Sequence, residues 1–154
     1  MKDAKNSMLS YMNHFKRFTN QLFQPLAKKY QLTQLEIGIL LFLHNNPSYN
    51  TARDIAEVRG FAKSNVSTAL DALQRKQYLT AEPDSANRKI RRIRLLAAAA
   101  PCVEELARCQ QEGFARVLAG FTQEERDLWW SFMQRMDQNL LRDLEEVQEE
   151  KEGK

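Results

Sequence analysis

The sequence predicts a mainly α-helical protein that carries one small β-hairpin. Apolar residues recur at three- and four-residue steps over most of the chain, which is the spacing of one face of an α-helix. Two short strand-like runs, "YLTAE" and "KIRRIRL", flank the turn-forming residues "PDSAN". The 154 residues are 43% hydrophobic, and this length and composition suit one compact domain with a sizeable core.

The first helix is expected over residues 8–30. Pro25 is expected to kink its end, because proline has no amide hydrogen to donate inside a helix. One face of this helix is apolar: Met8, Tyr11, Met12, Phe15, Phe18, Leu22 and Leu26.

The second helix is expected to begin at Thr33. Its hydroxyl can cap the helix while Glu36, three residues later, reaches back to the Thr33 amide as in a capping box. The run "LEIGILLFL" that follows is apolar nearly all round and is predicted to be buried, and "NNPSYN" ends the helix.

A third, short helix is predicted after Thr51. Asp54 lies at the position for the same reciprocal cap, and Gly60 ends the helix. Ile55 and Val58 are expected to face the core.

The stretch "FAKSNVSTALDALQRKQYL", residues 61–79, follows almost at once and predicts a fourth helix. Two helices joined by a tight turn are the pattern of a helix-turn-helix, whose second helix enters the DNA major groove. A solvated helix pair that binds nothing is the other interpretation of this stretch. Its apolar stripe consists of Val66, Ala69, Leu70 and Leu73, and its exposed front of Lys63, Ser64, Asn65, Ser67, Thr68 and Asp71.

The predicted hairpin is rich in basic residues, and this favours the DNA-binding interpretation over a helix pair that binds nothing. Ile93 and Leu95 are expected to face the core. A hairpin that lies along DNA can place one arginine in the minor groove and other cations against phosphates, and we assign these roles within the group Arg88, Lys89, Arg91 and Arg92. A winged helix-turn-helix is the economical interpretation.

Two long helices are predicted after the hairpin. Residues 95–121 are helix-prone, with Pro101 either in the first turn or breaking the run. Thr122 and Glu125 form another capping box, which opens a helix about 40 Å long. This helix is too long to bury its stripe on a small winged helix, so we expect a second copy of the chain to cover it, with the first helix joining the interface. The stripe is Trp129, Met133, Met136, Leu140, Leu144 and Val147.

Charge is spread unevenly along the chain. Residues 1–100 hold 16 Lys and Arg against seven acidic residues, a net charge of +9, whereas residues 101–154 hold seven against 13, a net charge of −6. This segregation suggests that the first part meets a polyanion, although a solvated surface alone could also produce it.

Several classes of protein are excluded by what the sequence lacks. No apolar run is long enough to span a membrane and no export signal is present, so we expect a cytoplasmic protein. Cys102 and Cys109 are expected to be buried thiols rather than redox sensors, and with His14 and His44 they form no zinc-type cluster. No phosphate loop or nucleophile–base pair indicates an enzyme, and no cofactor or metal is expected.

Two stretches resemble the MarR family of bacterial transcriptional regulators. "AKSNVSTALDALQRKQYL" is similar to the family's recognition helix, and "DSANRKIRRIRL" is similar to its wing signature D-x-x-D-R-R-x-x-x-V-x-L, with Asp84, Arg88, Ile93 and Leu95 in register. The order of elements agrees over nearly the whole chain. The corresponding organisation is an N-terminal dimerisation helix (1–32), a winged helix-turn-helix DNA-binding domain (33–96) and C-terminal dimerisation helices (97–154).

The resemblance implies a homodimer that binds an inverted-repeat operator in double-stranded DNA, most often as a repressor that a small ligand releases. By position it implies that Ser64, Asn65 and Thr68 meet base edges. It likewise implies that Lys63 and Ser67 meet phosphates and that Arg88 enters the minor groove. We expect this ligand to be a small aromatic effector. Four aromatic side chains either line a cleft for it or belong to the core: Tyr11, Phe15, Phe18 and Phe42.

The chain also departs from the family pattern. Ala62 stands where a capping serine is usual and Gln77 where a glycine usually ends the recognition helix, so we expect looser helix ends. Asn87 and Lys89 replace an acidic residue and a second arginine in the wing, and "LLAAAA" replaces "L-T-x-x-G". A winged-helix module for protein interaction and a nonspecific architectural DNA binder are the alternative functions.

Overall fold

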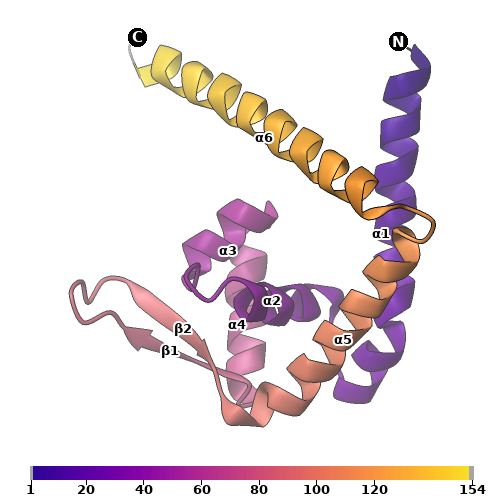
Figure 1. Cartoon of the computed structure of the whole chain (residues 1–154). Helices are drawn as coiled ribbons and strands as arrows, with labels where there is room; N and C mark the ends of the chain where they lie inside the picture. The colour runs from indigo at the N-terminus through magenta and orange to yellow at the C-terminus, as the bar shows by residue number, and fades with distance from the viewer. Residues whose placement is uncertain (1, 153–154) are drawn as a thin grey trace. The chain divides into compact units, whose positions relative to one another are not determined.

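The computed structural model describes residues 2–152, and it describes side chains for residues 6–145. The chain forms two compact units, Met1–Gly113 and Phe114–Lys154, and the boundary falls inside a helix. Its elements, labelled in Figure 1, are α1 (Lys2–Tyr30), α2 (Gln34–Asn45), α3 (Ala52–Arg59), α4 (Lys63–Arg75), β1 (Leu79–Pro83), β2 (Arg91–Leu95), the 3₁₀ helix η1 (Ala97–Ala99), α5 (Ala100–Val117) and α6 (Gln123–Glu152). The prediction of a mainly helical chain with one hairpin is confirmed.

The core of the first unit is built around α2. This helix is buried nearly all round, as "LEIGILLFL" predicted, because the other elements of the unit supply apolar side chains to it from several directions. The largest fully buried side chains are Ile37, Ile39, Leu40, Ile55, Leu73, Leu79, Leu106, Val66 and Cys102. Phe42 is buried in this core and so does not line a cleft.

The capping boxes at α2 and α3 have formed as predicted. The Thr33 hydroxyl accepts from the Glu36 amide at 3.1 Å, while the Glu36 carboxylate accepts from the Thr33 amide at 3.2 Å. Thr51 and Asp54 make the same pair of bonds at 3.1 and 2.9 Å. Each pair satisfies amides that the helix itself leaves unpaired, and so fixes where the helix starts.

Val58 was predicted to face the core, and this prediction is wrong, since the residue is 60% exposed. The buried face of α3 is made by Ile55 and Ala56, which are adjacent in sequence and lie about 100° apart around the helix. The centre of the buried face therefore lies midway between the directions of Ile55 and Ala56. Val58, on the far side of Ile55 from Ala56, is turned out of it.

Three helices of the first unit end in the left-handed backbone conformation. Gly60 ends α3 with φ +64°, while Gln31 after α1 and Gln77 after α4 adopt φ +53° and +59°. In all three cases the amide of the next residue donates back to the carbonyl five residues earlier, as in a Schellman motif. The helix α1 runs through Pro25 to Tyr30, and Pro101 lies in the first turn of α5.

The hairpin is antiparallel, with Leu79 opposite Leu95, Ala81 opposite Ile93 and Pro83 opposite Arg91. Ile93 is buried and Leu95 packs against the core, as predicted. The Ile93 amide donates to the Asn50 carbonyl at 2.7 Å, so the hairpin joins the segment that precedes α3. The wing is thus attached to the helix-turn-helix and is not a free two-stranded ribbon, which would be only marginally stable.

Helix α5 contributes to the first unit up to Gly113. Cys102 is buried, and burial raises the pKa of its thiol to about 11. Cys109 is half-buried, and its Sγ lies 3.5 Å from the Leu22 carbonyl oxygen on α1. Cys102 is therefore buried as predicted, whereas Cys109 is only partly buried, and the two thiols form no disulfide.

The second unit consists of the end of α5, a turn and α6. The predicted box at Thr122 and Glu125 is present, with bonds of 2.8 and 3.2 Å. Many large apolar side chains of α6 are exposed on this single chain: Leu128, Trp130, Phe132, Met133, Met136, Leu140, Leu141 and Leu144. The side chain of Val147, assigned to this stripe from sequence, lies outside the described residues.

Candidate nucleic-acid interface

The helix α4 packs one face on the core and exposes the other. Val66, Ala69 and Leu73 are buried and anchor it. The five α4 residues that were predicted to meet DNA are all exposed on the other face: Lys63, Ser64, Asn65, Ser67 and Thr68. Their side chains are short except at Lys63, so this face permits close approach of a ligand to the helix backbone.

The N-terminus of α4 carries no side-chain cap. Ala62 occupies the cap position, and the first turn contains no acidic residue. The positive end of the helix dipole is therefore not neutralised locally, and it favours an anion such as a phosphate. In the second turn the Thr68 hydroxyl donates to the Ser64 carbonyl at 3.0 Å, and its oxygen can still accept a hydrogen bond from a base or from water.

A hollow of about 280 Å³ lies between α4 and the hairpin. Its lining includes Ser67, Asp71 and Gln74 of α4 and Arg91 of β2. The Arg91 guanidinium also donates to the Ala81 carbonyl across the hairpin. Arg91 was predicted to contact DNA, and the structure places it beside α4, at the end of the strand ladder that adjoins the loop of the hairpin.

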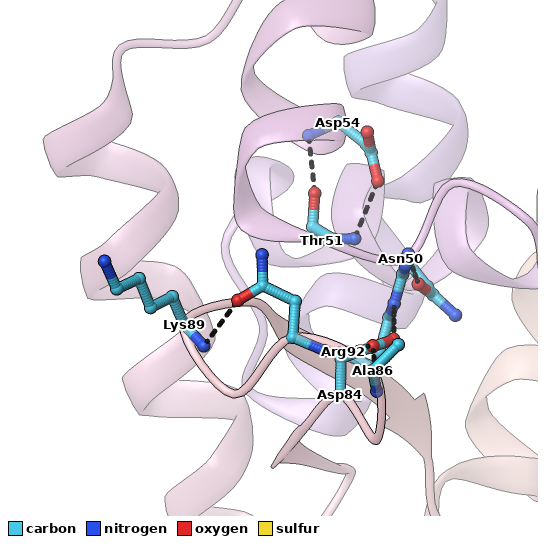
Figure 2. Close-up of polar contacts among 8 residues, drawn as sticks. Asn50, Thr51, Asp54, Asp84, Ala86, Lys89 and Arg92 are labelled. Atoms are coloured by element: carbon cyan, nitrogen blue, oxygen red, sulfur yellow. Dashed lines mark hydrogen bonds and ion pairs between the residues drawn. The ribbon is translucent and has the colours of Figure 1, made fainter.

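The loop of the wing, residues 84–90, is organised by one carboxylate (Figure 2). Asp84 Oδ1 accepts from the amides of Ala86 and Asn87 at 2.9 and 3.0 Å, and its own amide donates to the Ile90 carbonyl at 2.8 Å. Asn87 Oδ1 in turn accepts from the Lys89 amide at 3.1 Å. Asn87, a departure from the family pattern, thus helps to hold the loop.

Arg88 and Lys89 are exposed at this loop. Both flanking segments of backbone are held by the hydrogen bonds of Asp84 and Asn87, so the two cations project from an ordered turn. Such a turn can present cations to a nucleic-acid groove with little loss of conformational entropy.

Arg92, the last predicted contact, points back to the protein (Figure 2). Its Nε donates to Asp84 Oδ2 at 2.8 Å and its Nη1 donates to Asn50 Oδ1 at 3.1 Å. The Arg92 side chain is 38% exposed and that of Asp84 only 19%. Arg92 and the amides of Asn87 and Ala86 lower the pKa of Asp84 below its ordinary value, since all of them favour the charged carboxylate.

Asn50 is the residue of this region that sequence reasoning missed. It ends the turn "NNPSYN" and immediately precedes the Thr51 cap, so its pattern in the sequence indicated only a loop. Its partner Arg92 lies 42 residues later, and no local pattern predicts such a pairing.

The described residues contain no group of three or more His, Cys, Asp or Glu side chains that could hold a metal ion. Among the helices that the structure describes, none has a stretch long and apolar enough to cross a membrane.

Comparison with known proteins gives a consistent result. Residues 30–90 match the model of the MarR family. The transcriptional regulator SlyA is 20% identical with a TM-score of 0.75, covering 91% of this chain and 98% of its own. The complex of MepR from S. aureus with DNA is 21% identical with a TM-score of 0.69, covering 87% and 95%.

A third similar structure is a putative MarR family transcriptional regulator from Listeria monocytogenes, complexed with 26mer DNA. It is 15% identical with a TM-score of 0.77, and the match covers 88% of this chain and 89% of that one. At these identities the likeness establishes the fold, which is the winged helix of these regulators with its flanking helices.

Proposed function

Because this chain belongs to the MarR family, we propose that it is a homodimeric, sequence-specific DNA-binding regulator that represses transcription in the cytoplasm. On this proposal α4 enters the major groove and the loop of the wing enters the adjacent minor groove. The chain acts by occupying DNA and not by catalysis. Similar solved structures include two complexes with DNA, which supports the assignment of DNA as the partner.

One observation carries the proposal: the uncapped, acid-free first turn of α4 and the cations of the wing loop belong to the same compact unit. The roles follow the chemistry of each exposed side chain. Ser64, Asn65 and Thr68 read base edges, Lys63 and Ser67 hold phosphates, and Arg88 enters the minor groove with Lys89 beside it. The wing segment 79–95 also contains Arg91 and Arg92, whose side chains donate to protein oxygens.

The first test is selection from random duplex DNA by the purified protein at about 0.15 M salt. Enrichment of an inverted repeat, with half-sites about one helical turn apart, is expected of a dimeric winged helix. Arg88→Ala should weaken binding to the enriched duplex by about 1–3 kcal/mol while the dimer stays intact. Unchanged affinity would remove the minor-groove role of Arg88.

The salt dependence of binding separates this function from its alternatives. Log affinity should fall by about 0.9 per neutralised phosphate for each log unit of salt. Steep salt dependence without an enriched sequence would identify a nonspecific architectural DNA binder. Absence of DNA binding would instead favour a winged-helix module that meets an acidic protein partner.

The proposal also includes a small aromatic effector, which the resemblance to the MarR family implies. Phenolic and aromatic-acid compounds are expected to shift the melting temperature and to weaken operator binding together, because a ligand that favours one conformation changes both. If no compound in such a panel changes the melting temperature or the operator affinity, the proposal of an effector is wrong. A reporter gene behind the selected operator should be silenced by the protein, and an increase in expression would reverse the assignment as a repressor.

A further inference from the structure

The position of Arg92 does not suit the phosphate contact expected of a wing cation. Its guanidinium lies between two protein groups, Asp84 Oδ2 at 2.8 Å and Asn50 Oδ1 at 3.1 Å, and uses a different nitrogen for each. The side chain of Arg92 is 38% exposed, and Arg92 is only partly exposed as a residue, whereas Arg88 and Lys89 are exposed at the loop. Two of the five N–H donors of the guanidinium, on Nε and Nη1, are therefore engaged within the protein, and these bonds hold the side chain against Asp84 and Asn50.

The two partners of Arg92 belong to different parts of the fold. Asp84 organises the loop of the wing, since its other carboxylate oxygen accepts the amides of Ala86 and Asn87. Asn50 precedes the cap of α3, the first helix of the helix-turn-helix. Figure 2 shows Asn50 next to the Thr51–Asp54 capping box on one side and Arg92 on the other.

We propose that Arg92 is a positioning residue, which clamps the loop 84–90 of the wing onto the start of α3 and thereby sets Arg88 and Lys89 relative to the recognition helix. A second hydrogen bond joins the same two segments, because the Ile93 amide donates to the Asn50 carbonyl at 2.7 Å. Arg92 and Ile93 thus attach the hairpin to one residue through its side chain and its backbone. Since α3 packs against α4 in the same unit, the clamp also fixes the position of the wing relative to the recognition helix.

Arginine suits this role better than lysine does. The guanidinium is a rigid planar fork whose separate nitrogens reach two acceptors at fixed angles, whereas an ammonium is a single point charge on a flexible stem. Arg92→Lys keeps the charge and therefore separates the clamp from a simple electrostatic contact with DNA. Asn50→Ala breaks the same clamp from the other side and keeps all the charges of the wing.

The inference about DNA rests on the proposed function, so the clamp is first tested without DNA. Amide hydrogen exchange of the free protein reports the Ile93–Asn50 bond directly. Exchange of the Ile93 amide should accelerate by about fivefold in Arg92→Lys and in Asn50→Ala, the factor expected from the loss of one hydrogen bond. Arg94→Lys, on the same strand and exposed, is the matched control and should leave this amide unchanged. Unchanged exchange in both clamp variants would overturn the proposal.

The second test is a double-mutant cycle on the selected operator duplex. Arg92→Lys should weaken binding about tenfold and lower the salt slope by about 0.9 for each wing phosphate contact that is lost. In the Arg92→Lys background, Arg88→Ala should cost less than about threefold, because Arg88 would already be displaced. A merely structural role, or a phosphate contact of Arg92 itself, predicts additive losses, and additivity would overturn the proposal.

The two tests distinguish failure of the clamp from failure of the proposed function. If the wild-type protein selects no duplex, the proposed function fails, and the exchange of Ile93 alone decides whether Arg92 clamps the wing. Melting temperatures of all variants confirm that each is folded. If Arg92→Lys does not fold, Asn50→Ala carries both tests.

Discussion

Two glutamines hold a backbone conformation that glycine adopts more easily. Gln31 and Gln77 end α1 and α4 with positive φ, and the carbonyl of Gln31 accepts a hydrogen bond from the Lys76 ammonium at 2.5 Å. A side chain in this region costs about 1–2 kcal/mol through contact of its Cβ with the backbone. The recognition helix therefore ends in a strained residue, where the family pattern has a glycine.

Replacement of Gln77 by glycine should relieve that strain. Gln77→Gly is expected to raise the free energy of unfolding by about 1 kcal/mol, because the Schellman bond from the Tyr78 amide to the Leu73 carbonyl is kept. Urea denaturation measures the change. Gln74→Gly, inside α4, is the control and should lose about 1 kcal/mol; a loss in both variants would contradict the interpretation.

The buried thiol of Cys102 predicts a pH dependence of stability. Burial raises its pKa from 9.0 to about 11, so the folded state disfavours the thiolate that the unfolded chain forms readily. The contribution is fully present below pH 9.0 and is lost as the pH rises towards about 11. The free energy of unfolding should fall over this range more steeply in the wild type than in Cys102→Ala. Equal slopes would show that the thiol is not responsible.

At the scale of elements, the start of α4 lacks the side-chain cap that the starts of α2 and α3 have. Ala62→Ser should supply the missing cap and raise the free energy of unfolding by about 1 kcal/mol, since the hydroxyl can accept an amide of the first turn. Thermal and urea denaturation would measure this gain. Ala72→Ser, inside the same helix, is the control and should be neutral or destabilising. A gain at both positions would point to some effect other than capping.

The elements themselves were predictable because their signals are local. Thr33 with Glu36, and Thr51 with Asp54, mark helix starts within four residues of sequence, and Gly60 marks an end. The hairpin followed from the turn residues between two short strands. The departures at Ala62 and Gln77 were also visible. Ala62 leaves α4 without a side-chain cap, whereas Gln77 adopts the left-handed conformation and keeps the hydrogen bond that closes the helix.

The rest could not be predicted because it depends on distant partners. Periodicity placed Val58 inward, yet the neighbours that cover α3 lie over Ile55 and Ala56. Composition assigned four wing cations to DNA, Arg92 among them, whereas the Arg92 side chain meets Asn50 and Asp84. Which cations stay outside is decided by the packing of the hairpin on the helix-turn-helix.

At the scale of the whole molecule, the apolar surface of α6 is the feature that a single chain leaves unexplained. A helix of 30 residues is about 45 Å long, and its large exposed side chains include Met136, Leu140 and Leu144. Contiguous exposed apolar surface of this kind marks an interaction site. Met8, Leu9, Tyr11 and Met12 of α1 are exposed as well, and the proposed homodimer would cover them together with α6.

Charge placed on this surface should separate the subunits. The double variant Leu140→Glu, Leu144→Glu is expected to sediment as a monomer, because two carboxylates would have to be desolvated in the dimer interface. Both leucines are 61% exposed in the single chain, so the winged helix should keep its fold. Gln138→Glu, also exposed on α6, serves as the control for added charge. Persistence of a dimer in the double variant would place the interface elsewhere.

The bond between Asn50 and Arg92 also bears on the order in which the molecule folds. The strands of the hairpin are joined by a loop of seven residues and can pair early, but the bond between Asn50 and Arg92 spans 42 residues and needs the segment before α3 in place. Before docking, however, the paired strands are only a marginally stable ribbon. The bonds to Asn50 and the burial of Ile93 in the core are therefore what stabilise the hairpin, and this non-local step comes late in folding.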